Sequence, residues 1–363
     1  MNAMTWIYLL IGLVVLVFGA DWLVRGASRI AAKVGISSLV IGLTVVAFGT
    51  SAPEMAVSVG AALRGSADMA LGNVVGSNIF NVLGILGAAA LAAPLLVNKQ
   101  LIRLDVPVMI GVSVLAFVLC MDGNFSRIEG FGFLTLLFAY TGWLIFEARR
   151  EKALEARADE NTELKAHGST WINVGLIIIG LVFLVFGAQL LVGSATTIAR
   201  AFGVSDLVIG LTIVAIGTSL PELATSVIAT IKGERDIAIG NVVGSSIFNL
   251  LAVLGAASVV SEGGIKVAAS AIQFDLPVML AVAVVCFPIF ITGQVTRLQG
   301  AIMIFYYIAY TALLILTARQ HEAVSTFQGV LLYAVIPATL LYLVISLWKR
   351  PRPAGSVGQF EKP

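Results

Sequence analysis

Charged residues are scarce in this sequence. Lys, Arg, Asp and Glu together make up 12% of the 363 residues, whereas 59% are hydrophobic. A soluble domain carries about 25% charged residues and less than half apolar ones. No water-soluble fold could bury so much apolar surface, so the composition indicates a chain whose solvent is lipid.

Cysteine and histidine are also rare, with two of each. Cys120 and Cys286 lie inside apolar runs, which favours buried free thiols over a disulfide. His167 and His321 lie in polar connections, where solvated side chains are expected rather than metal ligands. Because no His lies in an apolar run, no Ser/His pair is available for an intramembrane enzyme. No cofactor is expected, and the net charge of +2 indicates no nucleic-acid partner.

Long apolar runs are abundant, and they predict an all-α membrane protein. A bilayer core about 30 Å thick needs roughly 20 apolar residues per helix. The runs are continuous rather than alternating, which argues against a β-barrel. The first run is interpreted as a span and not as a signal peptide. The eleven expected spans are 4–24, 37–63, 69–95, 104–121, 128–148, 172–194, 206–231, 237–260, 270–292, 298–318 and 326–348.

Basic residues predict the orientation, since cytoplasmic loops are enriched in Lys and Arg. With the N-terminus outside and the C-terminus inside, 17 of the 22 basic residues are cytoplasmic and 5 are external. The polar segment 149–170 is then a cytoplasmic linker, partly helical. The expected location is the cell membrane, as a multi-pass protein.

An internal repeat is the most informative feature of the sequence. Residues 41–84 match 209–252 at 28 of 44 positions with an offset of 168 and no gap. The expected organisation is a first repeat over 1–148, the linker 149–170, a second repeat over 171–320, and an extra span with a tail over 321–363. Each repeat contains five spans, so the second must be inverted relative to the first. Inverted repeats are typical of alternating-access transporters, whose substrate lies near the midplane between the halves.

Two glutamates occupy equivalent places in the repeats. Glu54 and Glu222 lie near the centres of spans two and seven, where an ionised side chain costs roughly 2.5–3.5 kcal/mol on insertion scales. Each follows a proline, Pro53 or Pro221, which should kink the helix and free carbonyl oxygens. Freed carbonyls are tolerated in lipid only where they face protein or a hydrated cavity. Kink and carboxylate together predict an oxygen-lined pocket.

Further oxygen donors repeat at helical spacing around the glutamates. Four residues separate hydroxyl from carboxylate, and hydroxyl from amide, so each pair shares a helix face. These residues are Thr50, Thr218, Ser77, Ser245, Asn81 and Asn249. Such a set, without Cys or His, suits Ca²⁺ or Na⁺ and argues against zinc or copper.

Three aspartates are expected to lie outside this pocket. Asp105 and Asp275 stand two residues before a proline at the start of a span, a helix-capping position. Asp21 can pair with Arg25 four residues on, and its counterpart in the second repeat is Gln189.

The GNVVGS segments, which are identical in both repeats, have a structural interpretation. Small residues let membrane helices approach closely, and this role is predicted for Gly72, Gly76, Gly240 and Gly244. Asn73 and Asn241 lie off the Ser77/Asn81 face and are predicted to form hydrogen bonds between helices.

The motifs GLTVVAFGTSAPE with GNVVGSNIFN, and GLTIVAIGTSLPE with GNVVGSSIFN, resemble the α-repeats of the sodium/calcium exchanger family of calcium/cation antiporters. The resemblance covers residues 1–320, and the short linker is similar to the prokaryotic branch. It implies a ten-span antiporter core, to which the span at 326–348 is an addition. Some family members carry Asp where this chain has Asn249, so neither ion selectivity nor potassium independence follows from the resemblance.

The resemblance also implies a set of ion ligands between spans two, three, seven and eight. Glu54, Glu222, Thr50 and Thr218 would hold Ca²⁺, and Asn81 and Asn249 would line the middle site. Sodium sites would be completed by Ser51, Ser77, Ser219, Ser245 and the backbone carbonyls of Ala47 and Ala215. Spans one and six would slide over the core, a role that fits Gly19 and Gly187.

The predicted function is therefore secondary antiport of Ca²⁺ against Na⁺ or H⁺, without enzyme activity. A dianionic pocket is neutralised by one Ca²⁺ or by competing monovalent cations, and an uncompensated pocket should resist closure. The alternatives are a cation channel, which is usually a symmetric oligomer with its filter on the axis, and an exchanger for another divalent cation. Stoichiometry and oligomeric state are left open.

Overall fold

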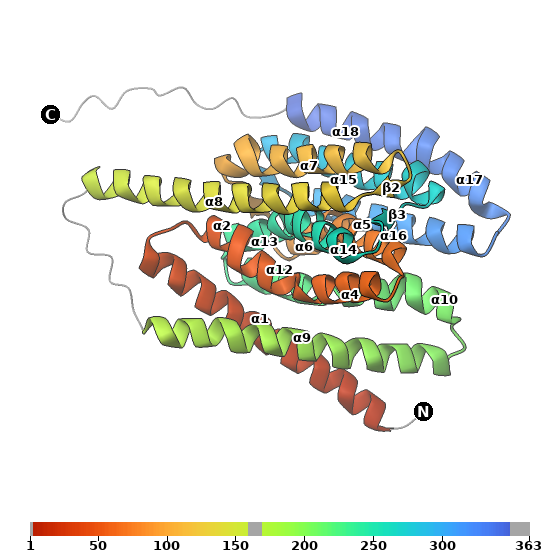
Figure 1. Ribbon diagram of the computed structural model, residues 1–363, viewed down its shortest axis with the longest axis horizontal. Helices are drawn as coiled ribbons and strands as arrows, with labels where there is room; N and C mark the ends of the chain where they lie inside the picture. The colour runs from red at the N-terminus through yellow and green to blue at the C-terminus, as the bar shows by residue number, and fades with distance from the viewer. Residues whose placement is uncertain (1–2, 159–168, 349–363) are drawn as a thin grey trace.

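A computed structural model describes residues 3–158 and 169–348, and within them the chain is almost entirely helical (Figure 1). The first half consists of α1 (Ala3–Val34), α2 (Ser38–Ile41), η1 (Gly42–Val46), α3 (Ala47–Thr50), α4 (Ala52–Leu63), α5 (Ala67–Phe80), η2 (Asn81–Leu86), α6 (Gly87–Ala92), β1 (Leu95–Leu96), η3 (Leu101–Asp105), α7 (Val106–Cys120), β2 (Asn124–Phe125) and α8 (Arg127–Ala158). The η segments are π-helical turns within longer helices.

The second half repeats this order element by element. It consists of α9 (Thr170–Ala201), α10 (Asp206–Ile209), η4 (Gly210–Val214), α11 (Ala215–Gly217), α12 (Leu220–Ile231), α13 (Arg235–Phe248), η5 (Asn249–Leu254), α14 (Gly255–Val260), β3 (Ile265–Lys266), η6 (Ala271–Asp275), α15 (Leu276–Ile291), β4 (Gln294–Val295) and α16 (Arg297–Ala318). The additional elements α17 (Ala323–Val330), η7 (Leu331–Val335) and α18 (Ile336–Trp348) follow. The predicted pair of five-span repeats is thus confirmed as the fold.

Short strands join the loops of one repeat to those of the other. β1 pairs with β4 and β2 pairs with β3, both antiparallel. The predicted topology puts both members of each pair on the same side of the membrane, so these sheets agree with an inverted second repeat.

Among the described residues, nine helices are long and apolar enough to cross a membrane, and a tenth span results if one bent pair is counted. The bent pair is Ser38–Thr50 with Ala52–Leu63, at an angle of 45°, just before Pro53. The chain breaks again between Gly217 and Leu220, next to Pro221, where one helix was expected over 206–231. Proline lacks the N–H that a continuous helix needs, so it begins α4 and α12 instead.

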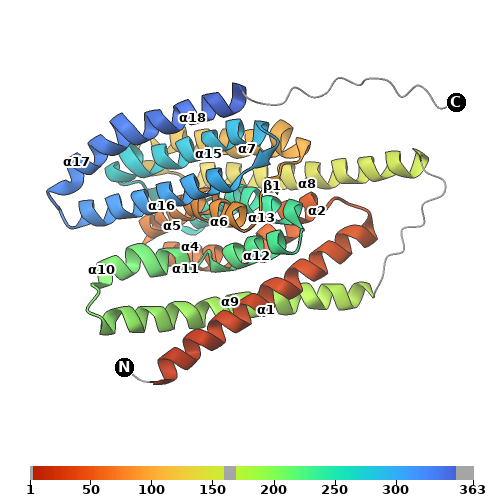
Figure 2. The same cartoon turned by 180° about the vertical axis from the view of Figure 1, so that it is seen from behind.

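Helices α1 and α9 lie together at one margin of the molecule (Figures 1 and 2). Both have 32 residues and extend past the expected spans 4–24 and 172–194. Their backbones touch, because a Cβ atom at Gly19 would lie 2.8 Å from the carbonyl oxygen of Gly180, and one at Gly187 would lie 2.8 Å from that of Gly12. The glycines at 19 and 187 therefore join these two helices to each other.

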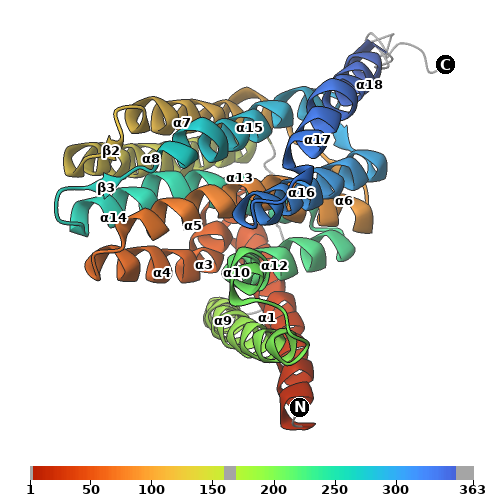
Figure 3. The ribbon, with the colours of Figure 1, turned by 90° about the vertical axis from the view of Figure 1, so that its right-hand side faces the viewer.

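The remaining helices form layers beside this pair. Viewed from the end, α4 and α12 lie next to α1 and α9, and α5 and α13 are central (Figure 3). Helices α7 and α15 lie beyond them, and α17 and α18 are at the opposite margin (Figure 3). An 18-residue apolar stretch of Arg235–Val260 is 100% buried within the protein, whereas that of Ala323–Trp348 is 6% buried. The interior is therefore built from the two repeat motifs, and the C-terminal helix lies outside it. The length and composition of this helix are sufficient for a membrane span.

The linker begins as a helix, since α8 continues to Ala158. The rest of the predicted linker, 159–168, and the C-terminal tail beyond Trp348 lie outside the described residues.

Candidate functional site

Two carboxylates lie at the broken helices in the centre of the fold. Glu54 is in the first turn of α4 and Glu222 is in the first turn of α12, and they are 0% and 1% exposed. The partial positive charge of a helix N-terminus stabilises a carboxylate at this position. The breaks before Pro53 and Pro221 thus give each acidic side chain a helix N-terminus deep in the protein.

The repeats exchange hydrogen bonds across the break. Ser51 Oγ donates to Glu222 Oε1 over 3.0 Å, and Ser219 Oγ donates to Glu54 Oε1 over 2.7 Å. Both serines are N-cap residues, yet neither side chain caps its own helix. Each carboxylate therefore belongs to a cluster made by both repeats, and its Oε2 atom is buried without a partner among the described residues.

The predicted threonines are held beside the carboxylates by amides. Thr50 Oγ1 donates a hydrogen bond to Asn241 Oδ1 over 3.0 Å. In the other repeat, Thr218 Oγ1 donates to Asn73 Oδ1 over 3.4 Å. Both asparagines thus form hydrogen bonds between helices, as predicted, and these particular bonds join different repeats.

The same amides also bind the helix that carries the glutamate of their own repeat. Asn73 Nδ2 donates to Ser58 Oγ over 2.9 Å, and Asn241 Nδ2 donates to Ser226 Oγ over 3.0 Å. Sequence reasoning missed Ser58 and Ser226, although both stand four residues after the glutamate in identical positions of the repeat.

The remaining predicted ligands differ in whether their polar atoms have hydrogen-bond partners. Ser77 Oγ lies 3.2 Å from Ser219 Oγ. Within the part of the chain that the structure describes, Ser245 Oγ is buried without a partner, Asn81 has no partner at either amide atom, and Asn249 has none at Oδ1. These buried polar atoms without partners need compensation, and a bound cation would satisfy the oxygens among them.

The two predicted carbonyl donors differ in their surroundings. Ala47 is 1% exposed and its oxygen lies 3.4 Å from Thr50 Oγ1, whereas Ala215 is exposed. The side of the site near Ala215 and the half-buried Thr218 is therefore the more open one.

The four glycines of the repeat motifs also have different surroundings in the two repeats. A Cβ atom at Gly240 would lie 2.8 Å from the oxygen of Leu39, and one at Gly244 would lie 2.7 Å from that of Leu43. These two glycines pack helices closely, as predicted.

The packing prediction was wrong for the first repeat. Among the described residues, no atom outside the adjoining turns of α5 comes within 4 Å of a Cβ built at Gly72 or Gly76, and Gly72 is exposed. Helix α13 is packed against α2, η1 and α3, but the corresponding face of α5 is free at these positions.

The capping prediction for two aspartates was also wrong. Asp105 and Asp275 end the π-helical turns η3 and η6 and make no side-chain cap. Instead, Tyr140 Oη donates to Asp105 over 3.0 Å and Tyr310 Oη donates to Asp275 over 2.9 Å. The helix continues through both aspartates, so its N–H groups need no cap there.

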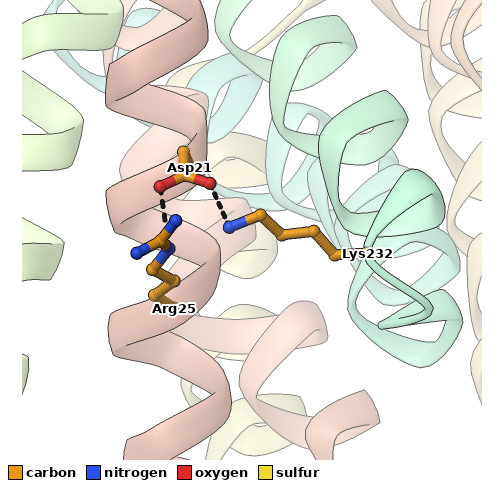
Figure 4. Close-up of polar contacts among 3 residues, drawn as sticks. All are labelled: Asp21, Arg25 and Lys232. Atoms are coloured by element: carbon orange, nitrogen blue, oxygen red, sulfur yellow. Dashed lines mark ion pairs between the residues drawn. The ribbon is translucent and has the colours of Figure 1, made fainter.

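Asp21 pairs with Arg25 at 2.8 Å, as predicted, and also with Lys232 at the end of α12 (Figure 4). Seven residues further along α1, Ser28 Oγ donates to Glu234 in the turn between α12 and α13. These contacts join α1 to the second repeat.

The sequence profile of the family described as sodium/calcium exchanger protein matches residues 4–146 and 172–316, one segment in each repeat. The putative antiporter CaxA of Alkalimonas amylolytica is 41% identical over 313 residues, covering 85% of this chain and 98% of the relative. The sodium/calcium exchanger MaX1 of Methanosarcina acetivorans is 33% identical over 352 residues, covering 86% and 99%.

A solved structure has the same fold over nearly its whole length. It is that of the sodium-calcium exchanger NCX_Mj soaked with 10 mM Na⁺ and 10 mM Sr²⁺, with a TM-score of 0.74 and 32% identity, covering 86% of this chain and 99% of that one. The profile match ends before α17, so the C-terminal helix lies outside the part that defines the similarity.

Proposed function

Because this chain belongs to the sodium/calcium exchanger protein family, we propose that it exchanges Ca²⁺ for Na⁺ or H⁺ by alternating access at the buried two-glutamate site. The observation that carries the proposal is the reciprocal pair of hydrogen bonds from Ser51 to Glu222 and from Ser219 to Glu54. It joins the acidic groups of both repeats in one cluster near the middle of the spans.

The chemistry of the cluster fits a divalent ion. Ca²⁺ takes six to eight oxygen ligands, and Glu54 and Glu222 supply two negative charges that balance one such ion. Neutral oxygens come from the hydroxyls and amides already described, together with the Ala47 and Ala215 carbonyls. Two Na⁺ ions or two protons would supply the same compensating charge, which makes them natural competitors.

Unequal packing of the repeats supports alternating access. The site is covered by α2, η1 and α3 on one side, while α5 is free of α10 and η4 around Gly72 on the other. In inverted repeats the two arrangements can be exchanged to open the opposite side. With the orientation predicted from basic residues, the covered side is cytoplasmic and the open side is external.

The alternative of a cation channel fits less well, because both halves of the site come from one chain and no central axis is needed. Proteoliposomes distinguish the two. We expect Ca²⁺ uptake to saturate and to require an outward Na⁺ gradient or a pH gradient. Uptake that persists at full rate without any counter-ion would favour a channel, and a stronger response to another divalent cation would change the substrate.

A further inference from the structure

Asn78 is a buried polar residue of α5 that the repeat pattern does not predict. It is 4% exposed, and the equivalent residue of the second repeat is Ser246. None of the proposed ion ligands explains why an amide should be buried there.

Two contacts account for both ends of the Asn78 amide. Its Nδ2 lies 3.8 Å from the sulfur of Met279 in α15, and its Oδ1 accepts a hydrogen bond of 3.3 Å from Asn249 Nδ2. Asn249 lies at the start of η5, which packs against both α4 and α5. The other end of the Asn249 amide, Oδ1, is buried and has no partner in residues 3–158 and 169–348.

These contacts can hold only one amide orientation well. The two ends of an amide have nearly the same shape, so their orientation depends on the partners. A thioether sulfur accepts hydrogen bonds and cannot donate, so the NH₂ group of Asn78 must face Met279. The oxygen of Asn78 then faces Asn249, so Asn249 must donate a hydrogen bond to it from its own NH₂ group. The oxygen of Asn249 is thereby left for a ligand.

The orientation of this amide matters to a cation. An oxygen lone pair attracts the ion, whereas an N–H group would point a partial positive charge at it. The pseudo-symmetric Asn81 lacks such support, because neither of its amide atoms has a partner. The hydroxyl of Ser246 donates to Val242 of its own helix instead.

We infer that Asn78, oriented by Met279, is a positioning residue that fixes Asn249 as an oxygen donor to the transported cation. The inference rests on the proposed function, since it takes Asn249 as a ligand. It explains how an uncharged residue can act at this position, where an amide could otherwise present either end.

The test compares Asn78→Ser in the wild-type and Asn249→Asp backgrounds. An aspartate presents an oxygen whichever way it turns, so it needs no orienting partner. Calorimetry of Ca²⁺ binding to the purified full chain should show affinity reduced about tenfold by Asn78→Ser alone, as for other residues that orient metal ligands. In the Asn249→Asp background the same substitution should change affinity by less than about twofold, because the coupling is lost.

Matched variants separate orientation from packing. Ser246→Ala, at the equivalent position, should leave affinity unchanged. If Asn78→Ser does not fold, Met279→Leu keeps the volume and removes the acceptor, and it should weaken binding roughly threefold in the wild-type background only. Equal losses in both backgrounds, or no loss in either, would overturn the inference. Ca²⁺ binding that survives Glu54→Gln in the same assay would instead refute the proposed function.

Discussion

Helices α13 and α5 come from equivalent segments of the two repeats, yet they have different surroundings. An 18-residue apolar stretch of the span that contains α13 is 100% buried, whereas the corresponding figure for the span that contains α5 is 83%. Gly42 and Gly240 bring α13 into contact with η1, whereas their counterparts Gly210 and Gly72 have open space around them. Since these glycines are the same in both repeats, the difference lies in how the neighbouring helix is arranged. If alternating access is the mechanism, we expect each repeat to adopt both the packed and the unpacked arrangement.

The largest expected effect lies where the repeats do not differ, at the two carboxylates. Glu54→Gln and Glu222→Gln should each abolish Ca²⁺ exchange in proteoliposomes, because either change removes half of the charge that balances the ion. The double variant should be no worse than either single one, since both groups act on one site. Clear exchange by either single variant would show that the carboxylates work separately.

The glycines test the comparison directly. Gly240→Ala places a methyl group 2.8 Å from a backbone oxygen, and should lower the free energy of unfolding by about 1–3 kcal/mol through overpacking. Gly72→Ala meets nothing here, so stability should change by less than about 1 kcal/mol, in the favourable direction that alanine gives a helix. Both variants should slow exchange. For Gly72→Ala the reason is that α5 is expected to pack as α13 does when the site opens on the other side.

Chemical unfolding in detergent and exchange in proteoliposomes measure these two effects. Equal losses of stability at Gly72 and Gly240, or full-rate exchange by Gly72→Ala, would mean that the open face of α5 never closes.

A smaller effect is expected at the contact between α1 and α12. Lys232→Met breaks the ion pair with Asp21, and this pair connects α1 to the second repeat. A partly exposed pair contributes about 0–1 kcal/mol, so the balance between the two arrangements should shift by up to about fivefold. Hydrogen exchange of Arg235–Phe248 should rise accordingly, less so at high salt. Gln189→Ala, at the position equivalent to Asp21, is the control. An equal rise in hydrogen exchange in this variant would mean that the two equivalent positions do not differ in their effect.

The smallest effect is expected at the two Asp–Tyr pairs. Asp105→Asn and Asp275→Asn should leave exchange intact, because neither aspartate contacts the ion cluster. Each should change stability by about 1 kcal/mol or less, as for one hydrogen bond, and more at Asp105, which is fully buried. Unfolding and transport assays check both values, and loss of Ca²⁺ binding by either folded variant would add that aspartate to the site.

The repeat made much of the fold and site predictable. A residue that appears twice in register, such as Glu54 or Asn73, stands out because the chain can be compared with itself. Helix breaks follow from Pro53 and Pro221 by the same comparison. Asn78 could not be found in this way, because its counterpart is Ser246 and its meaning depends on Met279, a distant residue of another helix.

Other features were not predictable because they depend on conformation or on longer-range packing. Nothing in the motif distinguishes Gly72 from Gly240, since only the arrangement of the neighbouring helix decides which one is covered. The position of Asp105 before a proline suggested a cap, but Tyr140, 35 residues away, satisfies the carboxylate instead.

The backbone contacts between α1 and α9 have a mechanical consequence. Glycine at 12, 19, 180 and 187 lets the two backbones lie in direct contact, with no side chain between them. We therefore expect α1 and α9 to move as one body. Since α1 packs against α12 and α9 packs against η4, such a movement would reach the second repeat on both sides of its break between Gly217 and Leu220.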